Sequence, residues 1–152
     1  ADSLGNLKKN FVINQIKFIK TLWNGNIGVH THDNLGLAIQ NSNDALDAGA
    51  NWVDSTVCGM GRGPGNAPTE YLYVELQNRN INKNISILPL LDLIENYFLD
   101  LKKKHKWGMN PFYYLSAMSN IHPTYIQEMI SFKLDNFEML NNINNLSSIN
   151  SR

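Results

Sequence analysis

The chain has 152 residues, the size of one ordinary domain, and its 13 basic and 13 acidic residues cancel to no net charge. This balance argues against nucleic acid or an anionic membrane as a partner, because both attract proteins through an excess of Lys and Arg. The sequence contains no apolar run of about 18 residues and no signal-like segment. We therefore expect a cytoplasmic protein without a membrane partner, and the single cysteine, Cys58, agrees with a reducing compartment.

Helices and strands are predicted to alternate in the first part of the chain. Apolar residues from Phe11 to Leu22 recur at helical spacing and predict a helix that ends at a turn over 24–26. The pattern then predicts a strand over 26–32, a helix over 35–48, a strand over 52–57 and a helix over 68–77. Short connections between successive βα units favour a parallel sheet.

The rest of the chain is predicted to be mainly helical. Residues 85–88 are a candidate for one more strand, although Pro89 disfavours it. Apolar residues from Leu91 to Leu101 predict a helix that ends in three lysines, where a helix C-terminus favours cations. Three short helices are expected after that, and their ranges are 112–118, 123–132 and 135–146.

Two histidines, His30 and His32, lie two positions apart at the end of the first predicted strand. Residues i and i+2 of a strand point to the same face, so the two imidazoles should aim at a common point. Neutral imidazole is the commonest protein donor to a divalent metal ion. If the pair binds one metal, its ring nitrogens should lie within about twice a metal–nitrogen bond of about 2.1 Å. Taken alone, the pair is weak evidence, because surface histidines often bind nothing.

A glycine-rich loop follows the second predicted strand, with four of the ten glycines between Gly59 and Gly65. The joint between a strand and a helix is where α/β enzymes build their sites. Asn66 is expected to cap the next helix, with Pro68 just inside it. The glycines by themselves are also explained by a tight turn.

These motifs occur in a specific order over residues 1 to about 76. They comprise Gly28-Val29-His30-Thr31-His32-Asp33-Asn34-Leu35-Gly36-Leu37-Ala38, Ala48-Gly49-Ala50, Val53-Asp54 and Gly61-Arg62-Gly63-Pro64-Gly65-Asn66-Ala67-Pro68-Thr69-Glu70. The set resembles the DRE-TIM metallolyase superfamily, with its HMGL-like or pyruvate carboxyltransferase domain, and within it the 4-hydroxy-2-oxovalerate aldolase-like proteins.

The resemblance implies an α/β fold, a partial TIM (β/α)₈ barrel followed by a helical region. Residues 1–90 would form the C-terminal half of the barrel and residues 91–152 the helical region. A complete barrel needs about 250 residues. Because Asp2-Ser3 resembles the end of the family's fifth strand, we expect a C-terminal fragment that begins in mid-barrel.

The resemblance also implies a divalent-metal-dependent lyase or aldolase, which breaks a carbon–carbon bond of a 2-oxo acid through a pyruvate-type enolate. It assigns His30 and His32 as ligands of Mg²⁺, Mn²⁺ or Zn²⁺. Asn66 is implied as a further ligand, although a helix cap explains it as well. Ser3 is the implied substrate contact. Tyr113 is a catalytic candidate that packing explains better, and no other catalytic residue is assigned.

Other interpretations stay open at this point. The family's first-strand Arg-Asp pair is absent from these residues, so we expect this piece alone to be inactive. The alternatives to an aldolase are an acyl-CoA Claisen synthase of the isopropylmalate or homocitrate synthase type and an inactive, truncated interaction module. The partners to consider are the 2-oxo acid substrate, a second copy of the chain and a partner dehydrogenase.

Overall fold

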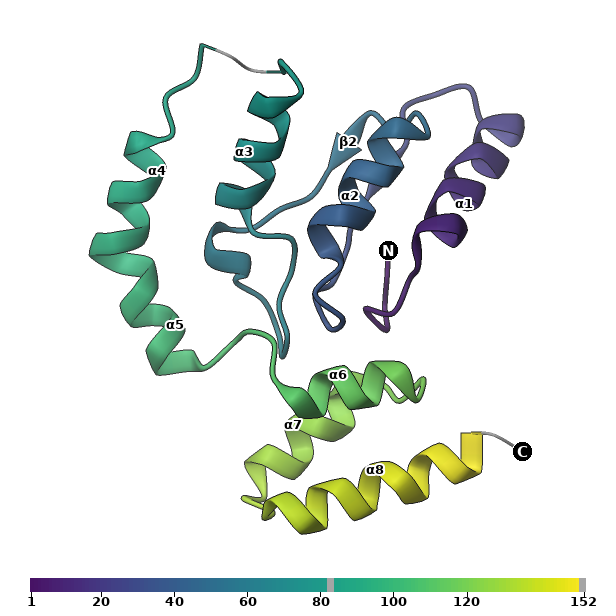
Figure 1. Ribbon diagram of the computed structural model, residues 1–152, viewed down its shortest axis with the longest axis vertical. Coiled ribbons are helices and arrows are strands. Elements are labelled where there is room, and N and C mark those ends of the chain that lie inside the picture. Colours follow the sequence, from purple (N-terminus) through teal and green to yellow (C-terminus); the bar gives the residue numbers. More distant parts are fainter. Residues whose placement is uncertain (82–83, 151–152) are drawn as a thin grey trace.

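A small parallel sheet lies inside the N-terminal part of the chain, in a computed structural model that describes residues 1–81 and 84–150 (Figure 1). Strand β1, Gly28–Val29, pairs in parallel with strand β2, Trp52–Val53. Both strands are shorter than the predicted ranges 26–32 and 52–57. Beyond the two paired residues of each strand, the chain instead forms single bridges with the glycine loop and the residues that follow it.

Three helices accompany the sheet, in the predicted order: α1 spans Lys9–Leu22, α2 spans Ala38–Asp47 and α3 spans Thr69–Asn78. Helices α1 and α2 pack against each other beside the sheet (Figure 1). Val12 and Ile16, one turn apart on α1, are buried together with Ile27, Ala45 and Ala50. This cluster is the apolar core of the N-terminal part.

A long helical rod follows, with α4 over Leu88–Leu93, a π-helical turn over Ile94–Phe98 and α5 over Leu99–His105. The rod runs along one side of the molecule (Figure 1). The predicted strand over 85–88 is wrong, because Leu88 begins α4 and Pro89 lies in its first turn. Proline is well suited there, since the first N–H groups of a helix have no intrahelical partner to lose. The predicted lysines do fall in the last turn of α5.

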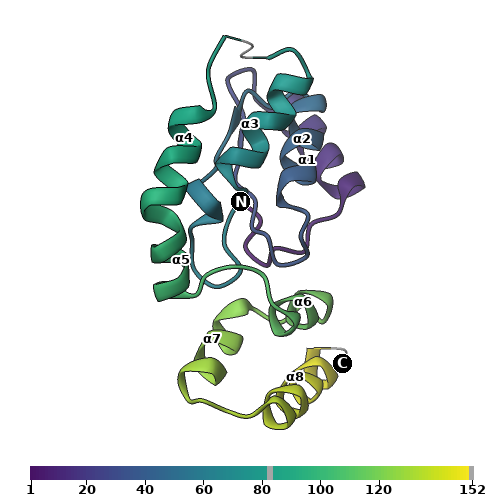
Figure 2. The same cartoon turned by 60° about the vertical axis from the view of Figure 1, so that its left-hand side comes forward.

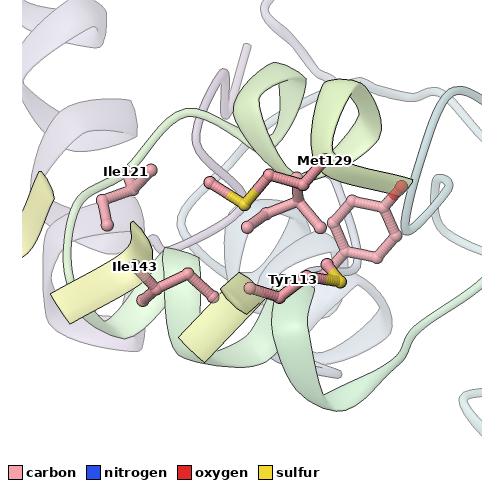
Figure 3. Close-up of a cluster of buried hydrophobic side chains, with 6 residues drawn as sticks. Tyr113, Ile121, Met129 and Ile143 are labelled. Atoms are coloured by element: carbon pink, nitrogen blue, oxygen red, sulfur yellow. The ribbon is translucent and has the colours of Figure 1, made fainter. Parts of the chain in front are cut away.

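The last three helices form a cluster of their own, grouped at one end of the molecule (Figure 2). They are α6, Pro111–Met118, α7, Pro123–Ser131, and α8, Asn136–Asn150. Asn110 caps α6 by accepting hydrogen bonds from two backbone N–H groups, and the His122 ring caps α7 by accepting one from the N–H of Thr124. The buried residues of this cluster, partly labelled in Figure 3, are Tyr113, Ile121, Ile126, Met129, Met139 and Ile143.

The described residues therefore form an α/β protein that is mostly helical, in agreement with the predicted class. No helix within residues 1–81 and 84–150 has both the length and the apolar character needed to span a bilayer.

The helical cluster yields a stability prediction. Ile143 is 2% exposed, so Ile143→Ala should lower the free energy of unfolding by about 2–5 kcal/mol, through lost burial and the cavity left behind. Ile149 lies on the same helix but is 67% exposed, and Ile149→Ala should change stability by less than about 0.5 kcal/mol. Urea unfolding followed by circular dichroism measures both. Equal losses in the two variants would contradict the assigned core.

Candidate metal centre

The two histidine rings face each other directly after strand β1. The Nε2 atoms of His30 and His32 are 3.4 Å apart, and the rings meet edge to face with centroids 4.9 Å apart. Two bonds of about 2.1 Å to one tetrahedral metal ion place their nitrogens about 3.4 Å apart. The pair therefore has the separation that two ligands of a single cation require.

The outer nitrogen of each ring is already engaged. His30 Nδ1 lies 3.1 Å from the Asp54 carboxylate, and His32 Nδ1 lies 2.5 Å from the backbone carbonyl oxygen of Asp2. A carbonyl oxygen or an ionised carboxylate can only accept, so each Nδ1 must donate its proton. In the neutral rings the unprotonated atoms are then the two facing Nε2 atoms. Two lone pairs at this distance repel unless a proton or a cation lies between them.

The first residues of the chain pack against residues 30–32, which carry the two histidines. The N–H of Asp2 donates to the carbonyl of His30, and Asp2 itself is buried. Burial raises the pKa of the Asp2 carboxyl, while neighbouring backbone N–H groups and the His32 ring act in the opposite direction. Gly5 has a φ of +61° and lies so close to the fully buried Asn34 that a Cβ would overlap the amide. Glycine is required here on both counts.

Asn66 lies opposite the second histidine. It forms an antiparallel bridge with His32, and its side-chain Nδ2 donates to the carbonyl of Met60. The prediction that Asn66 caps the following helix is wrong, because Pro68 is the N-cap of α3 and the first helical residue is Thr69. The loop backbone holds Asn66 against the histidine strand instead, since Asp33 N–H donates to the Gly65 carbonyl.

The other predicted site residues lie as follows. Ser3 is exposed, one residue after the carbonyl that meets His32. Tyr113 is 4% exposed and belongs to the helical core cluster, which agrees with packing; its catalytic role stays a prediction. Asp33, next to His32 in the sequence, accepts a hydrogen bond at Oδ1 from the N–H of Ala38, the first residue of α2.

The strand register places Asp54 at the site, a role that the sequence patterns did not predict. Val29 pairs with Val53 in the parallel sheet. The residues that follow them, His30 and Asp54, therefore lie side by side at the C-terminal ends of the two strands. The sequence did contain a signal for this role, because a polar residue follows each of two adjacent parallel strands, where α/β proteins bind ligands. The Asp2 carbonyl could not have been found this way, because a backbone oxygen has no sequence signature.

The described residues fit part of a metal site. Two imidazoles share one point, but no group of three or more His, Cys, Asp or Glu side chains within residues 1–81 and 84–150 could hold an ion. Mg²⁺ and Mn²⁺ prefer oxygen ligands, so a further carboxylate would have to complete the set.

The family model described as HMGL-like matches residues 1–96, well over half of the chain. The chain belongs to the HMGL-like family. This confirms the superfamily that the histidine and glycine-loop motifs predicted. It also places every residue of the candidate centre inside the matched range, whereas helices α6, α7 and α8 lie beyond it.

The proteins similar to this chain include aldolases and a lyase. The chain is 42% identical over 96 residues to a 4-hydroxy-2-oxovalerate aldolase of Thermus thermophilus, a match over 62% of this chain and 28% of that protein. The crystal structure of the N-terminal domain of an aldolase candidate from Bacteroides vulgatus is similar with a TM-score of 0.80 and 32% identity, over 93% of this chain and 46% of that one. A Bacillus subtilis HMG-CoA lyase is similar with a TM-score of 0.60 and 25% identity, over 70% of this chain and 37% of that one. The chain thus spans less than a third of the curated relative and less than half of either solved chain.

Cys58 is a free, buried cysteine at the start of the glycine loop. Its backbone anchors two parts of the fold, because its N–H donates to Glu70 and its carbonyl accepts from the Trp107 indole. Burial raises the pKa of the Cys58 thiol, the Glu70 carboxylate raises it further, and Lys102 acts in the opposite direction. The thiolate fraction of the folded protein is therefore lower than that of a free cysteine.

This environment predicts an unreactive thiol. Because a raised pKa leaves less thiolate at any pH below it, Cys58 in the native chain should react with Ellman's reagent at pH 8 at least about tenfold more slowly than in guanidinium. Cys58→Ser provides the blank, since the sequence has no other cysteine. Equal rates in the folded and unfolded states would show that the thiol is accessible.

Proposed function

We propose that this chain carries the histidine half of a divalent-metal site in an aldolase that cleaves a 4-hydroxy-2-oxo acid. The observation that supports it best is the pair of facing Nε2 atoms, 3.4 Å apart, with both Nδ1 atoms bonded to oxygen. A histidine that donates its second N–H to an oxygen is the usual arrangement of a metal ligand. Relatives named 4-hydroxy-2-oxovalerate aldolase give the substrate class.

The proposal includes a barrel of which this chain is one part. Residues 1–90 would supply its C-terminal βα units, and residues 91–152 would form the helical region outside it. Surface apolar side chains support further strands and helices beside this part, because Trp52 of β2 is 64% exposed and Phe18 of α1 is 58% exposed. Among the described residues, β1 and β2 are the only strands of this sheet, so more strands could pair with its edges.

Each residue of the site has a specific role in this proposal. His30 and His32 would hold the ion through Nε2, and Asn66 would add its amide oxygen, since its Nδ2 is turned to the Met60 carbonyl. A bound divalent cation would stabilise the negative charge that develops on the 2-oxo oxygen of the substrate. Another part of the complete barrel would supply the missing carboxylate, so these 152 residues alone should show no turnover.

A histidine substitution tests the metal role. In the polypeptide with the complete barrel, His30→Ala or His32→Ala should lower kcat/KM for a 4-hydroxy-2-oxo acid at least about a thousandfold, because several kcal/mol of charge stabilisation is lost. Pyruvate release, coupled to lactate dehydrogenase, measures it, and circular dichroism checks the fold. Lys103→Ala changes an exposed position on α5 and should leave turnover unchanged. Wild-type turnover in excess chelator would rule out metal catalysis.

The Asp54 carboxylate gives a second test. Asp54→Asn keeps the size of the side chain but weakens the acceptor that orients the His30 ring, and should reduce affinity for Mn²⁺ or Zn²⁺ by about 10- to 100-fold. Calorimetric titration of the complete polypeptide measures the affinity. Asp92→Asn makes the same change at an exposed position on α4 and serves as the control. Unchanged affinity in Asp54→Asn would remove this carboxylate from the site.

A further inference from the structure

A cavity of about 600 Å³ lies between the glycine loop, the end of α5 and helices α6 and α7. The tip of the loop, residues 61–63, forms one wall and residues 105–107 form the next. The lining residues, all in the described part of the chain, include neither His30 nor His32. The volume is typical of a site for a small organic molecule, for which cavities of about 300–1,000 Å³ are usual.

The charge of this cavity differs from that of the chain. Arg62, His105 and Lys106 line it, and no Asp or Glu is among the described lining residues. The whole sequence has 13 acidic residues for its 13 basic ones, so the excess of basic residues is specific to the lining of this cavity. Two fixed positive charges on the walls of one cavity favour an anion inside it. The Arg62 guanidinium in particular suits a carboxylate or phosphate, which it can bind with two hydrogen bonds.

The remaining walls offer a flat apolar surface and neutral donors. Trp107 is 8% exposed, and its indole N–H donates to the Cys58 carbonyl at 3.0 Å, which fixes the ring in place. Ile130 adds aliphatic surface from α7. Asn110 also lines the cavity; its Oδ1 caps α6, and its amide nitrogen is a neutral donor.

Tyr113 joins the cavity to the helical core. Its ring belongs to the apolar cluster, and Figure 3 shows its hydroxyl oxygen pointing away from Ile121 and Ile143. The hydroxyl is hydrogen-bonded to Gln127, which also lines the cavity. A Cβ on Gly63 would lie 3.0 Å from Gln127 Nε2 and 3.2 Å from two Tyr113 ring carbons, so glycine permits this close packing of the loop.

We propose that this cavity binds a small organic anion, in which a carboxylate or phosphate group meets Arg62 and Lys106 and a flat apolar body lies against Trp107. The cationic lining, the immobilised indole and the neutral donors together match that chemistry. The site is distinct from the histidine pair and does not depend on the function proposed for it. Its occupant contacts the same loop that carries Asn66.

Calorimetric titration of the complete polypeptide with benzoate and with phenyl phosphate tests the proposal. At least one of the two should bind, and the tighter one identifies the anionic group. Neutral benzyl alcohol should bind at least about tenfold more weakly, because it lacks the charge-assisted hydrogen bonds. Binding of benzyl alcohol as tight as that of both anions, or no binding of either anion, would overturn the proposal.

Matched variants locate the site. Arg62→Gln and Lys106→Gln should each weaken binding of the anion about tenfold. Lys103→Gln removes the same charge from an exposed position on α5 outside the cavity, and should change affinity less than about twofold. The double variant His30→Ala/His32→Ala should bind the anion as the wild type does. An equal loss in Lys103→Gln, or a loss in the histidine variant, would place the anion elsewhere, and thermal melts confirm that each variant is folded.

Discussion

The two hydrogen bonds at the outer nitrogens of His30 and His32 decide what the inner nitrogens can do. The Asp54 carboxylate and the Asp2 carbonyl each accept a hydrogen bond from an Nδ1–H, which turns both unprotonated Nε2 atoms to one point. Without these acceptors the rings could rotate or change tautomer, and the 3.4 Å separation would have no chemical meaning. The proposed metal site therefore rests on the strand register and on the fold of the first residues of the chain.

The glycine loop contacts both His32 and the segment between α5 and α6. One end of the loop bridges His32 through Asn66, and its tip accepts a hydrogen bond at Gly63 from the N–H of Gly108. The carbonyl of Cys58, at the start of the loop, accepts from the Trp107 indole. The same short loop therefore contributes to both sites: Asn66 lies beside His32 in the candidate metal centre, and residues 61–63 line the cavity.

The apolar core is divided between two places, which affects how substitutions should act. One cluster lies between α1, α2 and the sheet, and the other lies among α6, α7 and α8. The helical cluster is built from larger side chains, including Ile126, which is fully buried. The N-terminal cluster is smaller and leaves Trp52 largely exposed, as expected if more of a barrel packs there.

The sequence by itself determined the order of the helices, the strand that leads into His30 and His32, and the family. Helical and strand periodicities are local, and His30 and His32 are close along the chain, so both were accessible without tertiary contacts. The tertiary structure decided the short ladder, the role of Asp54, the position of Asn66 in a bridge and the helical conformation at Leu88. Each of these depends on partners distant in sequence or on the competition between a strand and a helix with proline in its first turn. Local patterns do not encode the outcome of either.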